Sequence, residues 1–405
     1  MADNASLSAA KSAKNDEFYT QYSDIEAEMN AYVEYDPDVF RGKTILLPCD
    51  DPEWSNFTKY FAANFDRFGL KKLISTSYAK SAGNKQLSLF EMSSPLFDEE
   101  LHETRGKLFT LSRDKDGSGS IDTDDIEFSG YLDGDGDFRS VEVTKLRDEA
   151  DIIITNPPFS LFREFLAWII DAGKQFVIIG NVNAITYKEV FPLIKDNKVW
   201  LGYSIHSGDR KFNVPDDYPL EAAGCGVDEN GRKYIRVKGV RWFTNIDHGG
   251  RHEALQLDTM AHNLKFNKSL RKKLETSYGV TDYPYYDNYE AIEVPFTECI
   301  PSDYDGVMGV PITFLDKYNP VQFEILGATQ RGCHDLVPDT KKYDEYWEMK
   351  PNGERTGSSG NKTNENANIR CNDGKKNYFI NSDGDVVQST YQRLFIRHKK
   401  GSNPQ

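Results

Sequence analysis

The sequence contains a tetrapeptide suited to holding a planar amine, Asn156-Pro157-Pro158-Phe159. The two prolines fix a rigid turn and remove backbone N–H donors, so the turn presents carbonyl oxygens. The amide oxygen of Asn156 beside such a carbonyl offers two acceptors to one exocyclic NH2 group. The ring of Phe159 can stack on the heterocycle that bears the amine. These groups could hold an amine with its lone pair free for in-line attack on a methyl donor. A plain strand-to-helix turn is the structural alternative.

The elements around the tetrapeptide predict a parallel sheet. An apolar run at 151–155 reads as a buried strand, and apolar residues at helical spacing follow over 161–170. The same order of strand, helix and strand is predicted over 45–77, with Ser55 as the N-cap and Gly69 as the helix terminator. We therefore predict an α/β fold with a doubly wound, Rossmann-like sheet that binds ligands beyond the carboxyl ends of its strands.

Weaker patterns predict the remaining elements. Thr186 and Glu189 form a capping-box pattern before a helix. After about 204 the helical periodicity weakens, and β-rich C-terminal additions are expected. Strands or short helices are predicted at 176–180, 199–201, 234–244, 310–327 and 386–398.

A chain of 405 residues has room for two domains. We predict a disordered tail at 1–13 and a core at 14–260 with an acidic insertion near 84–137. A C-terminal region, 261–405, is expected to include a mobile loop at 340–377, which is rich in Asn, Gly, Lys, Ser and Thr.

Composition excludes several classes of protein. With 49 basic and 64 acidic residues, the net charge of −15 excludes binding of nucleic acid by bulk positive charge. The five cysteines form no CxxC pair, which argues against a zinc knuckle or a disulfide framework. The sequence shows neither a secretory signal nor an apolar run long enough to span a bilayer. A soluble, cytoplasmic protein without membrane association is expected.

Placed after a buried strand, Asn156-Pro157-Pro158-Phe159 resembles the catalytic motif of S-adenosylmethionine-dependent amino-methyltransferases that act on adenine in DNA. The wider string at 151–165, DIIITNPPFSLFREF, is similar to the EcoRI-type adenine-specific DNA methyltransferases. The resemblance runs intermittently from about 14 to 397. It implies that 14–260 is the methyltransferase core with S-adenosyl-L-methionine as cofactor, and that the C-terminal region, 261–405, recognises DNA. It also implies catalytic roles for Asn156, Pro157, Pro158 and Phe159.

The resemblance also implies where the cofactor binds. The N-terminal segment, the loop after the first strand, and an Asp-Phe pair before the catalytic strand correspond to cofactor segments of the family. The loop after the first strand departs from the pattern of most methyltransferases because it contains no glycine. The alternative for this loop is a helix-capping role for its Asp residues, without cofactor binding. For the Asp-Phe pair the alternative is a Gly-Asp turn with a core Phe. The implied cofactor-binding residues are Phe18, Tyr19, Thr20, Pro48, Cys49, Asp50, Asp51, Asp137 and Phe138.

The acidic stretch at 114–125 resembles the calcium-binding loop of an EF-hand. Residues 114–125 match several ligand positions of an EF-hand loop, but position 12 is Asp125 rather than Glu. The flanking segments, 107–111 and 126–128, have the composition of strands rather than helices. We expect a solvated hairpin turn and no metal, with calcium binding as the alternative.

Two basic clusters could contact phosphates, with a solvated face as the alternative for each. Two histidines, His248 and His252, lack the ligand spacing of a metal site. The clusters comprise Arg232, Lys233, Arg236, Lys238 and Arg241, and Lys265, Lys268, Arg271, Lys272 and Lys273.

The expected function is transfer of a methyl group from S-adenosylmethionine to N6 of an adenine flipped out of a specific site in double-stranded DNA. A monomer is expected, in a restriction-modification setting with a cognate restriction endonuclease as candidate partner. Alternatives are methylation of an RNA base or of a protein glutamine amide, which also present a planar NH2. A calcium-stabilised binding protein is the alternative from another class.

Overall fold

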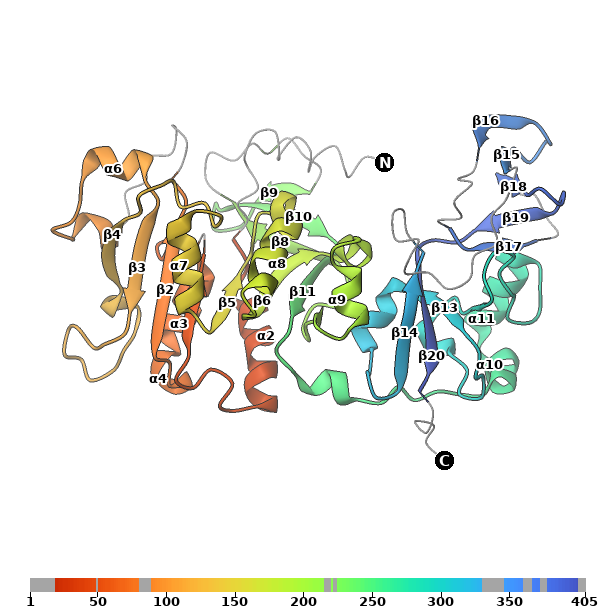
Figure 1. Cartoon of the computed structure of the whole chain (residues 1–405), viewed down its shortest axis with the longest axis horizontal. Helices are drawn as coiled ribbons and strands as arrows, with labels where there is room; N and C mark the ends of the chain where they lie inside the picture. Colours follow the sequence, from red (N-terminus) through yellow and green to blue (C-terminus); the bar gives the residue numbers. More distant parts are fainter. Residues whose placement is uncertain are drawn as a thin grey trace. The chain divides into compact units, whose positions relative to one another are not determined.

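The computed structural model describes residues 19–48, 50–79, 89–214, 220, 224–329, 346–359, 366–371 and 377–399. The chain forms two compact units, which we describe one at a time (Figure 1). The first unit comprises Met1–Val182 and Val199–Gly249, and the second comprises Asn183–Lys198 and Gly250–Gln405. The first unit therefore ends before residue 260, the predicted end of the core, and it excludes 183–198. The predicted tail at 1–13 lies outside the described residues.

An eight-stranded sheet in the order β4-β3-β2-β1-β5-β6-β11-β7 forms the centre of the first unit. β2, β1, β5 and β6 pair in parallel, whereas β3 and β11 run against both of their neighbours. Six of the eight strands consequently share one direction. All residues of β1 and β5 are buried, as expected for apolar strands covered on both faces.

The helices and strands of the first unit are α2 (Tyr22–Tyr35), β1 (Thr44–Leu47), α3 (Asn56–Ala63), α4 (Phe65–Phe68), β2 (Lys72–Ser77), α5 (Leu89–Met92), α6 (Glu99–Thr104), β3 (Lys107–Leu111), β4 (Glu127–Tyr131), α7 (Val141–Glu149), β5 (Ile152–Thr155), α8 (Phe162–Asp171), β6 (Gln175–Asn181), β7 (Trp200–Leu201), β8 (Asp209–Asn213), β9 (Cys225–Val227), β10 (Lys233–Lys238) and β11 (Val240–Thr244). β8, β10 and β9 form a separate three-stranded antiparallel sheet.

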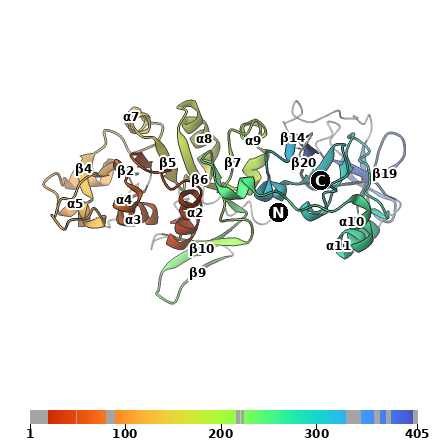
Figure 2. The ribbon, with the colours of Figure 1, turned by 90° about the horizontal axis from the view of Figure 1, so that it is seen from below.

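Helices lie on both faces of the central sheet: α7 and α8 on one side, α2 and α3 on the other (Figure 2). The predicted helix after β1 is confirmed with its cap, since Ser55 Oγ accepts hydrogen bonds from the backbone N–H groups of Phe57 and Thr58. Gly69 terminates the following helical turn in the left-handed conformation, with φ 60°. The α/β fold with parallel central strands is confirmed.

The order of the central strands creates a topological switch point. From β1 the chain continues to β2 on one side, whereas β5 pairs with the other side of β1. In open α/β sheets, ligands bind outside the carboxyl ends of strands at such a point. The carboxyl ends of β1 and β5 are therefore where the fold positions a site.

Two local predictions were wrong. The capping box does not form, because the helix α9 (Phe191–Lys195) has Val190 at its N-cap and Thr186 Oγ1 instead donates to the carbonyl of Asn183, 3.0 Å away. The single strand predicted at 234–244 is two strands that belong to different sheets. They break at Gly239, whose φ of 69° is strained for other residues, and where a Cβ would lie 3.0 Å from Val182 Cγ1.

The second unit is rich in β-structure, as predicted. It contains a four-stranded sheet, β12-β13-β20-β14, and a five-stranded antiparallel sheet, β16-β15-β18-β19-β17. Its other helices and its strands are α10 (Met260–Phe266), α11 (Lys268–Lys273), β12 (Ile292–Glu293), β13 (Met308–Pro311), β14 (Phe323–Ala328), β15 (Trp347–Met349), β16 (Arg355–Ser359), β17 (Asn368–Arg370), β18 (Tyr378–Ile380), β19 (Val386–Ser389) and β20 (Arg393–His398).

The range 340–377, predicted as one loop, includes β15, β16 and β17 in its described parts. These strands are only three to five residues long, too short for a pattern of apolar alternation to reveal them. Among the described residues, no helix is long and apolar enough to cross a membrane.

Candidate functional site at the carboxyl ends of β1 and β5

Thr155, the last residue of β5, joins the carboxyl ends of the two strands at the switch point. Its Oγ1 lies 2.8 Å from the carbonyl oxygen of Pro48 and 2.6 Å from Asp50 Oδ2. Ser55 Oγ, which caps α3, donates to Asp50 Oδ1 over 2.7 Å. The loop after β1, the N-terminus of α3 and the turn after β5 are thus held together by one set of buried hydrogen bonds.

The Asp50 side chain at the centre of this set is only 7% exposed. Burial raises its pKa to about 7, although the hydrogen bonds from Thr155 and Ser55 act in the opposite direction. The geometry agrees with a protonated carboxyl, because Thr155 has one hydroxyl proton for two acceptors. A protonated Asp50 would donate to Thr155 Oγ1 and leave the Thr155 proton for the carbonyl of Pro48.

The turn that follows Thr155 contains the two predicted acceptors, Asn156 Oδ1 and the Pro157 carbonyl. Asn156 is half-buried with its Oδ1 atom inside, and Pro157 is buried. The carbonyl of Pro158 accepts a hydrogen bond from the Leu161 N–H group at 2.9 Å. Within the described part of the chain, no donor reaches the carbonyl of Pro157. Asn156 Oδ1 and the Pro157 oxygen therefore stay the predicted acceptor pair.

The predicted N-terminal cofactor segment is anchored at the same end of the sheet. Tyr19 exchanges two backbone hydrogen bonds with Asn213, of 2.8 and 3.0 Å, and extends the edge of β8. Asn56 Nδ2, in the first turn of α3, donates to the carbonyl of Thr20 over 2.6 Å. Phe18 and Cys49 lie outside the described residues. Asp51 is half-buried, and its Oδ1 accepts from the backbone N–H group of Glu53 at 2.9 Å.

Two buried hydroxyl groups at this end of the sheet have no hydrogen-bond partner among the described residues, Thr20 Oγ1 and Ser77 Oγ. Ser77 is the last residue of β2 and is 7% exposed. Buried polar groups are nearly always hydrogen-bonded, so these two hydroxyls are candidate contacts for a bound ligand or an ordered water. Sequence reasoning missed Ser77, and its position at a strand's carboxyl end was the one available signal.

The loop before α7, residues 133–138, packs against the carboxyl end of β2. The N–H group of Ala79 donates to the carbonyl of Asp135 over 2.7 Å. Gly136 has φ 87°, and a Cβ there would lie 2.5 Å from the carbonyl oxygen of Ser77. A glycine is therefore required for this close approach. The loop thus lies beside one of the two unpartnered hydroxyl groups.

Within this loop, Asp137 and Phe138 differ in their surroundings. Asp137 accepts hydrogen bonds from Arg139 Nε and Nη2 at 2.9 and 2.6 Å, and this pairing holds the pKa of Asp137 below its usual value. Phe138 is 2% exposed and packs edge-to-face on Phe165 and Trp168. The packing favours the alternative interpretation for Phe138, a core ring, over stacking on a ligand.

The predicted basic residues of β10 lie on different faces of the sheet β8-β10-β9. Alternation along β10 places Arg236 and Lys238 with Tyr234, on the face opposite Ile235 and Val237. Sequence reasoning missed Lys211, which pairs with Arg236 across the strands and lies 4.5 Å from the ring of Tyr234. We refer to Lys211, Tyr234, Arg236 and Lys238 as the basic face of this sheet.

Other members of the basic clusters fall elsewhere. Lys233 is half-buried on the face of Ile235, and Arg232 precedes the strand. Arg241 is 4% exposed and donates to the backbone carbonyls of Val240 and His206, so its predicted phosphate contact is wrong. In the second unit, Lys268, Arg271 and Lys272 of α11 and Lys265 of α10 are exposed, and Lys273 Nζ lies 5.3 Å from the ring of Tyr278.

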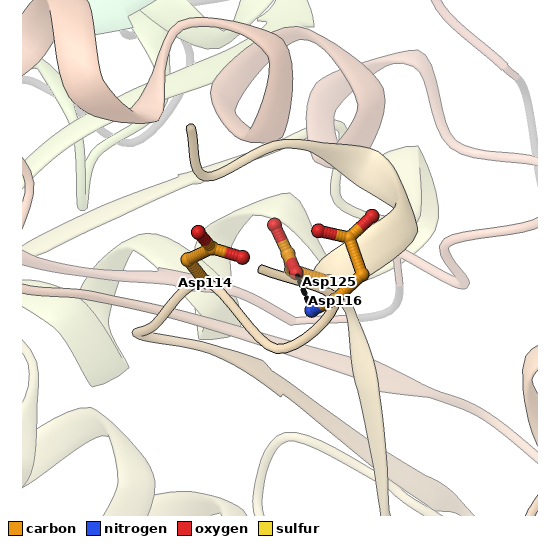
Figure 3. Close-up of side chains that lie close together, drawn as sticks. All are labelled: Asp114, Asp116 and Asp125. Atoms are coloured by element: carbon orange, nitrogen blue, oxygen red, sulfur yellow. Dashed lines mark hydrogen bonds between the residues drawn. The ribbon is translucent and has the colours of Figure 1, made fainter. Parts of the chain in front are cut away.

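The acidic stretch forms the tip of the β3–β4 hairpin, as predicted. Asp114, Asp116 and Asp125 gather there, with one ligand atom of each within 4.8 Å of the others (Figure 3). The Asp125 carboxylate already accepts from the backbone N–H groups of Lys115, Asp116 and Asp122, as turn residues do. Calcium binding stays the alternative prediction.

The ring of His248 is buried, with Nε2 3.0 Å from the carbonyl of Leu201.

Comparisons with known proteins concern the chain as a whole. The family model of "Adenine-specific methyltransferase EcoRI" matches residues 6–399. The chain is 46% identical to the type II methyltransferase M.EcoRI of Escherichia coli over 80% of this chain and 89% of that protein. It is 33% identical to the type II methyltransferase M.MpnI of Mycoplasma pneumoniae over 83% of this chain and 89% of that protein. No solved structure matches the chain.

Proposed function

The chain belongs to the EcoRI family of adenine-specific methyltransferases, and from this premise we propose that it methylates N6 of an adenine in a specific site of duplex DNA, with S-adenosyl-L-methionine as donor. The Thr155–Asp50 contact carries the proposal. It joins the loop after β1 to the turn that bears Asn156 at the switch point of a Rossmann-like methyltransferase sheet.

The chemistry assigned to the turn is positioning rather than covalent catalysis. Asn156 Oδ1 and the Pro157 carbonyl accept the two N6 hydrogens, which directs the nitrogen lone pair toward the methyl donor. Phe159 stacks on the adenine ring, and Pro158 keeps the turn rigid through its bond with Leu161. Protein groups that hold the amine in this geometry raise the rate without forming an intermediate with the base.

S-adenosylmethionine supplies a methyl group activated by a positively charged sulfonium. The residues that would hold it surround the unpartnered hydroxyls: Thr20 with Tyr19 on one side, and Ser77 with Asp137 on the other. Asp50, Asp51 and Pro48, in the loop after β1, complete the proposed set. Both hydroxyls can donate to or accept from the cofactor's polar groups, so the donor set fits the ligand.

Binding of DNA is proposed from the position of the target base in a duplex and from the exposed cations of the protein. An adenine stacked in a duplex is out of reach of the turn, so the base must be flipped out at a cost of a few kcal/mol. The basic face of β8-β10-β9 and the exposed cations of α11 are proposed to contact phosphates. The proposed form is a monomer in the cytoplasm, with a restriction endonuclease as candidate partner.

The test is methylation of DNA by the purified protein with labelled S-adenosylmethionine, followed by single-molecule sequencing of the product. Wild type should place N6-methyladenine in one sequence context. Asn156→Ala should lose turnover while its affinity for S-adenosylmethionine, measured by calorimetry, stays within about threefold, because Asn156 faces the target amine. Wild-type turnover in Asn156→Ala, or methyl groups on RNA or protein instead of DNA, would contradict the proposal.

A further inference from the structure

Phe212, the fourth residue of β8, contacts the ring of Phe159. Phe159 belongs to the turn at 156–159, which we call the catalytic turn. The ring centroid of Phe212 lies 6.4 Å from that of Phe159, and the two planes meet at 89°. Phe212 is 1% exposed, whereas Phe159 is half-buried. An edge-to-face pair is held at a preferred angle by the charge distribution of the two rings. One ring is therefore fixed in the core and the other lies between the core and the site.

The position of Phe212 is fixed by its strand. β8 pairs with β10 in an unbroken antiparallel register that places Phe212 opposite Ile235. Phe212 belongs to the main hydrophobic cluster of the first unit, with Ile235 and Phe159 packed against that cluster. The next residue, Asn213, holds Tyr19 through two backbone hydrogen bonds. One short strand thus supports the aromatic of the catalytic turn and the start of the cofactor segment.

We propose that Phe212 is a positioning residue for methyl transfer, which holds the Phe159 ring in the orientation that stacks on the flipped adenine. This inference rests on the proposed function. Phe212 itself touches neither substrate nor cofactor and acts through Phe159. An aliphatic side chain at 212 would fill much of the same volume but would lack the ring edge that fixes the angle of Phe159.

The test compares Phe212→Leu and Phe212→Met with Phe159→Leu. Each is given a duplex that carries the target site, for single-turnover rates, and a duplex with 2-aminopurine at the target position. Phe212→Leu and Phe212→Met should slow methyl transfer by about ten- to a hundredfold, because a small displacement in a reacting geometry is costly. Quenching of flipped 2-aminopurine should fall as in Phe159→Leu, whereas S-adenosylmethionine affinity should stay within about threefold of wild type.

Phe109→Leu is the matched control. Phe109 is fully buried in the same hydrophobic cluster, but its ring packs against Phe128 in the β3–β4 hairpin. This variant creates a comparable loss of packing away from the turn, so rate and quenching should stay within about threefold of wild type. In the double variant, Phe212→Leu should add no further loss to Phe159→Leu, because both changes act on one ring.

The outcomes separate the two proposals. If Phe159→Leu loses rate and quenching but Phe212→Leu and Phe212→Met keep both, the positioning role is wrong and the proposed function stands. Equal losses in Phe212→Leu and Phe109→Leu would likewise reduce Phe212 to a packing residue. If wild type does not methylate adenine in DNA, or Phe159→Leu behaves as wild type, the proposed function itself fails.

Discussion

At the residue scale, Asp50 makes hydrogen bonds that its sequence context did not suggest. The resemblance implied that the carboxylates after β1 contact the cofactor directly. The structure buries Asp50 and gives both of its oxygens protein partners, Ser55 and Thr155. Asp50 therefore links the loop after β1 to the end of β5, and burial raises the pKa of its carboxyl to about 7. Asn is the closest mimic of the protonated form, since it has one acceptor and one donor group.

The stability of the protein should depend on pH through Asp50. Its pKa is about 7 in the folded protein and 3.8 in the unfolded chain, so the folded state binds the extra proton between these values. Wild-type stability should therefore be highest below pH 3.8 as far as this group is concerned, fall as pH rises toward about 7, and level off above.

Asp50→Asn should remove this dependence. Relative to Asp50→Asn, wild type should lose about 2–3 kcal/mol of unfolding free energy between roughly pH 5 and pH 8. Urea unfolding of both proteins at several pH values measures the difference. Parallel pH profiles would show that Asp50 keeps an ordinary pKa and that the buried carboxyl is ionised throughout.

Asp137 should contribute to the cofactor pocket, whereas Asp116 should not. Loss of a charge-assisted hydrogen bond in Asp137→Ala should weaken S-adenosylmethionine binding by about ten- to a hundredfold. Asp116, at the tip of the β3–β4 hairpin, is the matched control for loss of one carboxylate. Calorimetry that gives equal affinities for Asp137→Ala and Asp116→Ala would remove Asp137 from the pocket.

At the element scale, the apolar strands and the helices between them were predictable from sequence. β1, β5 and β6 contain continuous apolar runs, and the capped helix after β1 was recognised from Ser55 and Gly69. β8 was missed because four of its five residues are polar. The role inferred for its buried Phe212 depends on the contact with Phe159, which the sequence does not show. Local patterns do not encode such contacts between distant segments.

The same limit applies to the site. The position of the tetrapeptide 156–159 directly after a buried strand was predictable, because the apolar residues of β5 identify that strand. Its catalytic role stays a prediction. Ser77 and Lys211 have no distinctive sequence context, and strand pairing alone identifies their positions. Arg241 was misassigned because its neighbours in sequence are basic, while its side chain turns inward to backbone carbonyls.

The two faces of β10 should respond differently to substitution. Arg236 is exposed on the basic face, and Lys233 is half-buried on the other side. Arg236→Ala should reduce the slope of log affinity for DNA against log salt by about 0.9, the effect of one phosphate contact. Lys233→Ala should leave the slope unchanged. Equal slopes for wild type and Arg236→Ala, from fluorescence anisotropy over a salt series, would remove this face from the DNA interface.

At the scale of the whole molecule, opposite charges occupy different elements. The net charge is −15, yet one group of acidic residues lies in the β3–β4 hairpin and its following loop, whereas groups of cations lie on the basic face and on α11. Bulk charge therefore does not predict whether this protein binds DNA. The interface has to be identified element by element.

Substitution of the cations of α11 tests whether the second unit contacts DNA phosphates. Replacing Arg271, Lys272 and Lys273 by Ala should flatten the salt dependence of DNA affinity by up to about 2.7, if all three contact phosphates. The ratio of affinities for cognate and non-cognate sites should change little, because phosphate contacts carry no base information. An unchanged slope would mean that these cations are solvated and favour only the helix C-terminus.

The acidic hairpin has a consequence for how the first unit meets its substrate. β3 and β4 form one edge of the eight-stranded sheet, whereas β10 continues through Gly239 into β11, next to the opposite edge. Negative and positive charge are thus separated along the sheet, which gives the unit an electric dipole. In the field of a polyanion such a dipole experiences a torque that turns the basic end forward before any contact forms. Productive encounters should consequently be more frequent than the net charge alone would allow.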